Sequence, residues 1–222
     1  MPIQIIQRLS SPFMENGYFI YDNQNGKKEC IIIDPGLEPQ NFVQFIEERD
    51  LTPVAILCTH GHADHIAGIA LLKEKYPKII TIIGEKDAKK LENPHENLSE
   101  PFGFPLSLPP ADRVLFQNGE EVEAISLAGL EIEARHTPGH SAGHAIFWIK
   151  GTEPPALIVG DLIFERSIGR HDFPDGDFEA LARSIRRHVY TFPDETILYP
   201  GHGDPTTVGN EKRYNRVVRG ED

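Results

Sequence analysis

The sequence contains little cysteine. Its two cysteines, Cys30 and Cys58, each end or abut an apolar run, which favours buried, reduced strand residues over a disulfide. The first residues also lack the basic segment and apolar stretch of a secretory signal, so we expect a cytoplasmic protein. Because no apolar run approaches the ~20 residues that a membrane-spanning helix needs, we expect no membrane partner.

Positive charge is scarce as well. The 222 residues include 22 lysines and arginines against 34 aspartates and glutamates, which gives a net charge of -12. This excess of negative charge argues against nucleic acid as a partner, although a few local arginines can still hold a small anionic substrate. There is no low-complexity tract, long charge run or internal repeat, and the length suits one domain over residues 1–222.

Apolar and alternating runs predict ten strands, and periodic runs predict five helices. The expected strands are Ile3–Leu9, Tyr18–Tyr21, Cys30–Ile33, Val54–Thr59, Ile79–Gly84, Val122–Ser126, Leu130–Arg135, Ala145–Ile149, Ala156–Val159 and Thr196–Tyr199. The expected helices are Pro39–Arg49, Asp64–Tyr76, Lys86–Leu91, Phe178–Tyr190 and a short one near Asn210–Val218. Strands come first and then alternate with helices, which indicates an α/β chain with two sheets and helices outside them.

Two connections have their own signatures. Asn23–Gly26 is expected to form the hairpin turn between the second and third strands. The Pro-rich stretch Asn93–Pro110 has no clear periodicity, which favours a loop or lid, or a plain surface excursion.

The segment from Thr59 to His65 (Thr-His-Gly-His-Ala-Asp-His) holds four potential metal ligands just after a predicted strand. In a helix His60 and His62 would point apart, because two positions turn the chain by ~200°. In an extended loop their side chains share a face, while Asp64 and His65 enter the first helical turn and point elsewhere. One short segment can therefore supply two adjacent metal sites.

A second histidine segment runs from His136 to His144. His140 follows the tight turn at Pro138-Gly139, so a loop can aim it inward. We expect His136 and His144 to have supporting or structural roles rather than to bind metal.

Two further candidates also follow apolar strands. Asp161 ends a very apolar run, where a carboxylate is costly to bury unless it is paired or binds metal. His202 lies between two glycines that let the backbone approach closely. Imidazole and carboxylate donors without thiolate suit Zn²⁺, and also Fe or Mn, in a catalytic site. No Gly-x-Ser-x-Gly motif suggests a serine nucleophile instead.

This spaced set of motifs resembles the metallo-β-lactamase superfamily, from Asp34-Pro35-Gly36 to Gly201-His202-Gly203. The resemblance implies an αββα sandwich with two divalent metal ions, Zn²⁺ first among them, at one edge of its sheets. It implies that His60, His62 and His140 hold one metal, that Asp64, His65 and His202 hold the other, that Asp161 bridges them, and that Asp34 orients a ligand. Asp64 and Asp161 would be the catalytic carboxylates.

Within the superfamily, the stretch Gly160–Arg170, the pair Asp172-Phe173 and the stretch Pro200–Thr207 resemble the compact bacterial branch of the glyoxalase II group, the hydroxyacylglutathione hydrolases. That likeness implies hydrolysis of a thioester such as S-lactoylglutathione by a water activated between two metals. Longer members carry a C-terminal helical domain that binds glutathione, and here only about twenty residues follow His202, so the thiol carrier stays open. The candidate contacts for an anionic thioester are Arg166, Arg170, Lys212 and Arg213.

Other functions of the same fold remain as alternatives. A mononuclear-iron persulfide dioxygenase would use only His60, His140 and Asp161, and Gly169–Phe173 is similar to that branch too. Nucleic-acid-cutting members usually add a basic arm or domain, which this acidic chain lacks. The expected cytoplasmic location argues against a β-lactamase. A non-enzymatic metal-binding module is disfavoured because all seven ligands are present.

Overall fold

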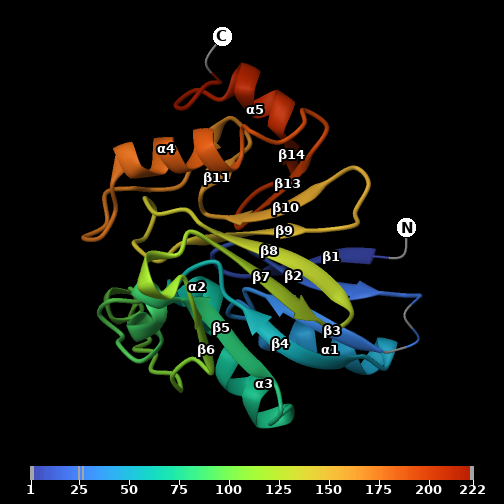
Figure 1. Ribbon diagram of the computed structural model, residues 1–222. Coiled ribbons are helices and arrows are strands. Elements are labelled where there is room, and N and C mark those ends of the chain that lie inside the picture. The colour runs from blue at the N-terminus through green and yellow to red at the C-terminus, as the bar shows by residue number, and fades with distance from the viewer. Residues whose placement is uncertain (1–2, 25, 27, 221–222) are drawn as a thin grey trace.

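The computed structural model describes residues 3–24, 26 and 28–220. Figure 1 shows two sheets that face each other, with helices on the outer side of each. The layers run helix, sheet, sheet, helix, so the predicted αββα sandwich is confirmed.

The first sheet holds six strands in their order along the chain, β1 to β6. The first three pair antiparallel, and β3 to β6 pair parallel. The strands are β1 (Ile3–Ser10), β2 (Glu15–Asp22), β3 (Glu29–Ile33), β4 (Thr52–Leu57), β5 (Ile80–Gly84) and β6 (Arg113–Leu115).

The second sheet has the order β14-β13-β10-β9-β8-β7. Its strands pair antiparallel except for the parallel pair β10 and β13. They are β7 (Val122–Leu127), β8 (Leu130–His136), β9 (Ala145–Ile149), β10 (Ala156–Gly160), β13 (Ile197–Pro200) and β14 (Thr206–Thr207). A small hairpin of β11 (Ile163–Phe164) and β12 (Ser167–Ile168) lies apart from both sheets.

The helices divide between the two outer layers, as Figure 1 shows. The first sheet is covered by α1 (Pro39–Arg49), α2 (Ala63–Ile66) and α3 (Ile69–Lys75), and the second by α4 (Phe178–His188) and α5 (Val208–Tyr214). Short 3₁₀ helices are η1 (Glu85–Leu91), η2 (Glu100–Phe102) and η3 (Gln117–Gly119). No helix in the described part of the chain has the length and apolar character to cross a membrane.

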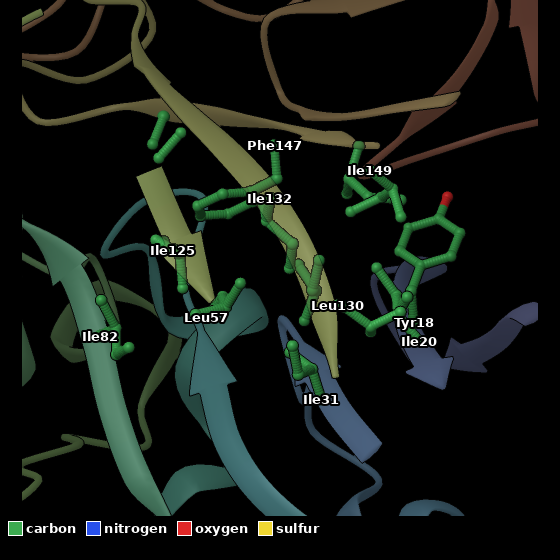
Figure 2. Packing of buried hydrophobic residues seen from close by; sticks show 14 of the residues in the cluster. Tyr18, Ile20, Ile31, Leu57, Ile82, Ile125, Leu130, Ile132, Phe147 and Ile149 are labelled. Atoms are coloured by element: carbon green, nitrogen blue, oxygen red, sulfur yellow. The ribbon is translucent and has the colours of Figure 1, made fainter. Parts of the chain in front are cut away.

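Three apolar cores follow from the alternation of side chains along the strands. On β3, Ile31 and Ile33 enter the core between the sheets, whereas Cys30 and Ile32 enter the core under α1 and α3. Figure 2 shows the core between the sheets, where Ile31 and Leu57 face Ile132 and Phe147. The third core joins the second sheet to α4 and α5. Cys30 and Cys58 are free and buried, as predicted.

The single helix predicted over Asp64–Tyr76 is wrong, because the chain forms α2 and α3 with a break at Ala67 and Gly68. The amide of Gly68 donates to Pro35 O at 2.7 Å, and a Cβ on Gly68 would lie 2.5 Å from the same oxygen. Because the Gly68 amide bonds to the loop after β3, it does not make the hydrogen bond that would continue the helix. The spacing of apolar residues in the sequence gives no sign of this contact.

Other boundaries also differ from the predictions. The predicted α-helix at Lys86–Leu91 is the 3₁₀ helix η1, and α5 begins and ends earlier than predicted. The strands β6, β11, β12 and β14 have two or three residues each, too few to show a period in the sequence. Part of the predicted turn at Asn23–Gly26 lies outside the described residues.

Candidate metal centre

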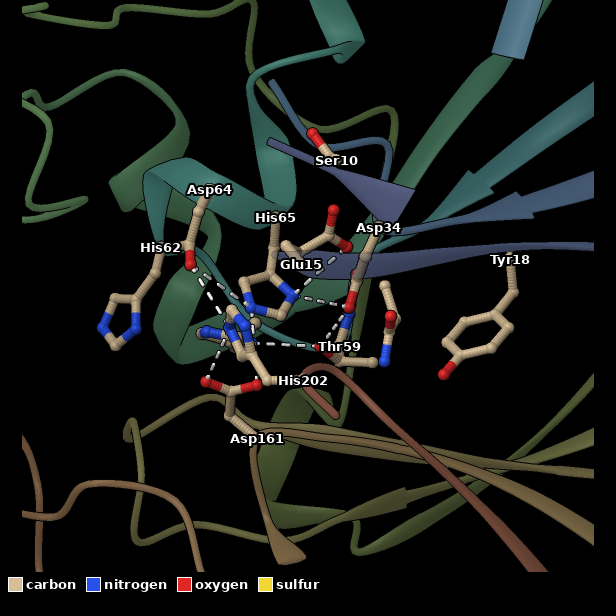
Figure 3. A network of polar contacts seen from close by, with 12 residues as sticks. Ser10, Glu15, Tyr18, Asp34, Thr59, His62, Asp64, His65, Asp161 and His202 are labelled. Atoms are coloured by element: carbon tan, nitrogen blue, oxygen red, sulfur yellow. Dashed lines mark hydrogen bonds and ion pairs between the residues drawn. The ribbon is translucent and has the colours of Figure 1, made fainter. Parts of the chain in front are cut away.

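The predicted ligands lie where strands end. The segment after β4 carries His60 and His62, and the turn after β8 carries His140. Asp161 directly follows β10, and His202 lies two residues after the parallel strand β13. Figure 3 shows several of these side chains converging at one edge of the sandwich. The amide of Asn16 at the start of β2 donates to Gly201 O at 2.7 Å and so joins the two sheets at this edge.

Three histidines form the first cluster. His140 Nε2 lies 3.2 Å from His60 Nε2 and 3.0 Å from His62 Nδ1, and all three side chains are buried. Two ligand atoms bound to one tetrahedral ion at ~2.1 Å lie roughly 3.4 Å apart, so these separations fit a shared metal ion. Burial, reinforced by neighbouring histidines, holds the pKa of His60 and of His62 well below the usual value. Both rings are therefore neutral, as metal ligands must be.

Asp64, His65 and His202 form the second cluster. Asp64 Oδ2 lies 3.4 Å from His202 Nε2 and 3.8 Å from His65 Nε2. Burial opposes charge on His65, but Asp161, Asp64 and Asp34 outweigh it and raise its pKa well above the usual value. Burial likewise opposes charge on Asp64, but His65 and His202 lower its pKa to about 2. The carboxylates around His65 thus favour positive charge at this point, which a bound cation would supply.

Asp161 lies between the two clusters. Its Oδ2 is 3.6 Å from His140 Nε2 and 3.6 Å from His202 Nε2, and its Oδ1 is 3.4 Å from His65 Nε2. Asp161 Oδ1 and His65 Nε2 are buried without a hydrogen-bond partner among the described residues. Such groups are costly unless something satisfies them, and the donor chemistry of both clusters fits two divalent metal ions.

Gly201 makes this close approach possible. A Cβ at this position would lie 2.3 Å from Asp161 Oδ1 and 2.7 Å from His65 Cε1. Any larger residue before His202 would therefore push the carboxylate away from the second cluster.

Hydrogen bonds fix the ring orientation of the histidines. His65 Nδ1 donates to Asp34 Oδ2 at 3.0 Å, and His140 Nδ1 donates to Arg170 O at 2.7 Å. His60 Nδ1 lies 3.0 Å from Thr59 Oγ1, which donates to Asp34 at 2.6 Å. Since that hydroxyl has one proton to give, it accepts from His60. In all three rings Nε2 is then left to face the centre.

Two acidic residues at the centre gave no signal in the sequence. Asp87 is buried and accepts hydrogen bonds from Gly61 N at 2.9 Å, Ser141 Oγ at 2.7 Å and Gly143 N at 2.7 Å, so it ties the two loops of the first cluster together. Glu15 is buried 3.9 Å from His65 Nδ1, and burial raises its pKa. A single carboxylate in an otherwise ordinary strand or helix pattern looks like a surface residue.

The two remaining histidines of the second motif lie outside both clusters. His136 Nε2 donates to Ala142 O at 2.9 Å. His144 is buried beside Thr137 Oγ1 at 2.9 Å, and its ring stacks on His60 with centroids 5.4 Å apart.

The candidate substrate cations lie in different places. Arg170 lines the cavity beside the metal ligands and forms two hydrogen bonds with Asp172, at 2.9 and 3.0 Å. The Arg166 side chain is exposed, 3.8 Å from Glu165. Lys212 and Arg213 both pair with Asp194, at 3.0 and 3.1 Å. These last three residues are not among those that line the cavity.

The cavity itself has a volume of about 300 Å³, which is enough for a small ligand. Five of the predicted metal ligands line it, namely His62, Asp64, His140, Asp161 and His202. The other lining residues are Phe13, Ala63, Asn97, Leu98, Phe102, Phe104, Phe164, Arg170 and Phe173.

Comparison with known proteins identifies the family. The model of the metallo-beta-lactamase superfamily matches residues 11–202. The chain belongs to this superfamily. It is 39% identical over 218 residues to hydroxyacylglutathione hydrolase GloC of Haemophilus influenzae, with 97% of each chain covered. The resemblance inferred from the motifs is therefore confirmed.

Two solved structures are similar over almost their whole length. BLEG-1 B3 metallo-beta-lactamase has a TM-score of 0.88 and 31% identity, with 97% of this chain and 99% of that chain covered. TTHA1623 in a di-iron-bound form has a TM-score of 0.80 and 33% identity, with coverage of 95% and 98%. That second structure holds two iron ions.

Proposed function

We propose that this chain is a two-metal hydrolase that cleaves thioesters such as S-lactoylglutathione. The observation that carries the proposal is the pair of donor clusters joined by Asp161, whose two oxygens lie 3.4 to 3.6 Å from nitrogens of both clusters. The likeness to hydroxyacylglutathione hydrolase GloC supports a thioester as the substrate. We propose Zn²⁺ for both positions, with Fe or Mn as the alternatives.

Bound metal ions would lower the pKa of a shared water toward neutrality and polarise the substrate carbonyl. Asp64 lies in the second cluster at the metal centre. Its side chain lines the cavity and stays ionised, because its pKa is lowered to about 2 despite burial. A carboxylate oxygen of Asp64 can therefore accept a hydrogen bond from the attacking water and orient it.

The described lining of the cavity offers no hydroxyl, thiol or amine nucleophile. Among the described residues that line it there is no serine, threonine, cysteine or lysine. Both cysteines are buried in the core under α1 and α3. Attack by water fits this lining, and a thiolate with a pKa of ~8.5 leaves without a strong general acid.

The test is a thioester panel on metal-characterised protein. We expect two ions per chain by elemental analysis, hydrolysis of S-lactoylglutathione, and label from ¹⁸O water in the carboxylate product without a burst of thiol. A trapped acyl-enzyme at any serine or cysteine would rule the mechanism out. Nitrocefin should be hydrolysed far more slowly than the thioester, and the reverse order would favour a β-lactamase, as the likeness to BLEG-1 allows.

The mononuclear dioxygenase remains the alternative within this fold. It needs only His60, His140 and Asp161, whereas Asp64, His65 and His202 lie together as a second complete donor set. That second set supports the hydrolase. Oxygen consumption with glutathione persulfide, together with one iron per chain, would favour the dioxygenase instead.

A further inference from the structure

Large apolar side chains form one wall of the cavity beside the metal centre. This apolar wall consists of Phe13, Leu98, Phe102, Phe104, Phe164 and Phe173. It is assembled from the turn between β1 and β2, the loop between η1 and β6, and the segment after Asp161. Phe13 and Phe102 meet edge to face with ring centroids 5.1 Å apart, so two distant segments close around one rim.

Phe102 is the exposed member of the wall, and the loop that carries it is anchored. Phe102 is 60% exposed, so part of its ring is accessible to a ligand at the cavity. The loop is held by Asn97, whose carbonyl accepts from Ala63 N at 2.8 Å and whose side-chain amide donates to Lys90 O and Leu106 O at 2.9 Å each. The exposed ring therefore sits on a well-bonded support beside α2.

Outside the two donor clusters, the polar side chains that line the cavity already have partners. Arg170 is the one cation other than histidine among the described residues that line it. Its guanidinium is paired with Asp172 and lies 4.3 Å from the Phe173 ring centroid. The Asn97 amide is used within its own loop. Little in the lining thus selects the carboxylates of glutathione.

We propose that the thioesters selected by this chain carry an apolar group next to the scissile carbonyl, which packs against Phe102, Phe104 and Phe164. The proposal rests on the proposed thioester hydrolysis and adds the substrate class. A lactoyl group is small and carries a hydroxyl, so it would leave the wall exposed. A linear acyl chain of about six carbons or an aromatic ring would cover it within the cavity of about 300 Å³.

The first experiment measures kcat/KM for two matched thioester series. In one series the thiol is N-acetylcysteamine and the acyl group grows from acetyl through butyryl to hexanoyl. In the other the acyl group is acetyl and the thiol grows from ethyl to benzyl. We expect kcat/KM to rise about three- to fourfold per buried methylene in one of the two series, which also identifies the side that contacts the wall.

Variants of the wall test its part in this preference. Phe102→Ala should lower the hexanoyl-to-acetyl ratio, or the benzyl-to-ethyl ratio, by roughly fivefold or more, and Phe102→Leu should restore most of it. The matched control is Val122→Ala on β7, since Val122 is similarly exposed at 49% and does not line the cavity. The control should keep the wild-type ratio. Metal content and thermal unfolding of each variant check that it is folded.

Equilibrium binding separates this proposal from the proposed hydrolysis. Non-hydrolysable S-alkyl thioethers of the same lengths are titrated into the metal-loaded protein by calorimetry. We expect affinity to rise with chain length in the wild type and to lose that dependence in Phe102→Ala. This result supports the proposed role of the wall even if no thioester is hydrolysed and the proposed function is wrong. If neither kcat/KM nor affinity depends on chain length and S-lactoylglutathione is the best substrate, the proposed role of the wall is wrong. The proposed thioester hydrolysis is then still supported.

Discussion

Thr59 makes two hydrogen bonds to Asp34, from its amide to Oδ1 at 2.8 Å and from its hydroxyl to Oδ2 at 2.6 Å. The same Oδ2 accepts from His65 Nδ1 at 3.0 Å, while the Thr59 hydroxyl accepts from His60 Nδ1. One carboxylate therefore orients a ligand of the second cluster directly and a ligand of the first cluster through a hydroxyl. Asp34 is positioned to support both metals at once.

Removal of that hydroxyl should weaken the two metal sites unequally. In Thr59→Val the first cluster loses the link to His60 and should bind metal about tenfold or more weakly, while the second cluster keeps its direct contact with Asp34. Asp34→Asn should weaken both, and asparagine tolerates the backbone φ of 48° at this position. Chelator competition measures each affinity.

The control is Thr81→Val, whose buried hydroxyl has no partner among the described residues. Equal weakening of both sites in Thr59→Val would contradict the relay.

Loss of Asp161 should be more damaging than loss of any single supporting histidine. Asp161→Ala removes the carboxylate between the clusters, so we expect reduced metal occupancy and at least a ~100-fold loss of thioesterase activity. His136→Ala removes only a bond to Ala142 O and should cost far less. Elemental analysis and initial rates on purified protein make the comparison. Similar activity in the two variants would show that the ligands are wrongly assigned.

Asp87 should matter for stability as well as for the metals. Asp87→Asn places a side-chain amide among three donors, so at least one buried hydrogen bond is lost, at a cost of about 1–3 kcal/mol in the free energy of unfolding. Urea titration of the metal-free protein measures this. Asp50→Asn disrupts an exposed ion pair with Lys28 and should change the free energy by no more than about 1 kcal/mol. If Asp87→Asn unfolds at the same urea concentration as the wild type, Asp87 does not stabilise the contact between the two loops.

Metal removal should destabilise the fold in a reversible way. Asp34, Asp64 and Asp161 lie close together around His65, and cations at the two clusters would offset their mutual repulsion. Chelation should therefore lower Tm, and return of two equivalents of metal should restore it. Scanning calorimetry at constant ionic strength gives the result. If one equivalent restores the full Tm, the second cluster is not a metal site.

The two thiols should report unfolding rather than surface chemistry. Burial raises the pKa of Cys30 to about 12 and raises that of Cys58 as well, so neither is a reactive thiolate at neutral pH. A disulfide reagent should detect essentially no thiol in the native protein at pH 8 and both thiols in guanidinium. Rapid labelling of one cysteine under native conditions would show that the core under α1 and α3 opens locally.

The sequence was informative where function depends on short segments. His60, His62, Asp64 and His65 stand within six residues directly after an apolar strand, and strand ends meet at an edge of a sheet. The αββα layering followed from the same strands and motifs. The structure brings the seven proposed ligands together as two clusters with Asp161 between them.

The sequence was uninformative where distant segments meet. Nothing near Asp87 indicates that Gly61 and Gly143 donate to it from two separate loops. Lys212 and Arg213 lie close to His202 in sequence, but both pair with Asp194 in the folded chain. The break before α3 depends on one contact with Pro35 O from another loop. Such pairings depend on tertiary packing, and the local pattern of apolar residues does not predict them.

The two halves of the apolar wall differ in how freely they can change. Phe173 packs against His62 and His140 with ring centroids 4.9 and 5.6 Å away, and the neighbouring Arg170 carbonyl holds His140 Nδ1. Substitution in that half would disturb the metal ligands. Phe102 and Phe104 belong to a loop that reaches the ligand helix through a backbone bond between Ala63 and Asn97, which does not depend on side-chain identity. Relatives that diverge in substrate should therefore differ first in this loop, and it is the natural place for directed evolution of selectivity.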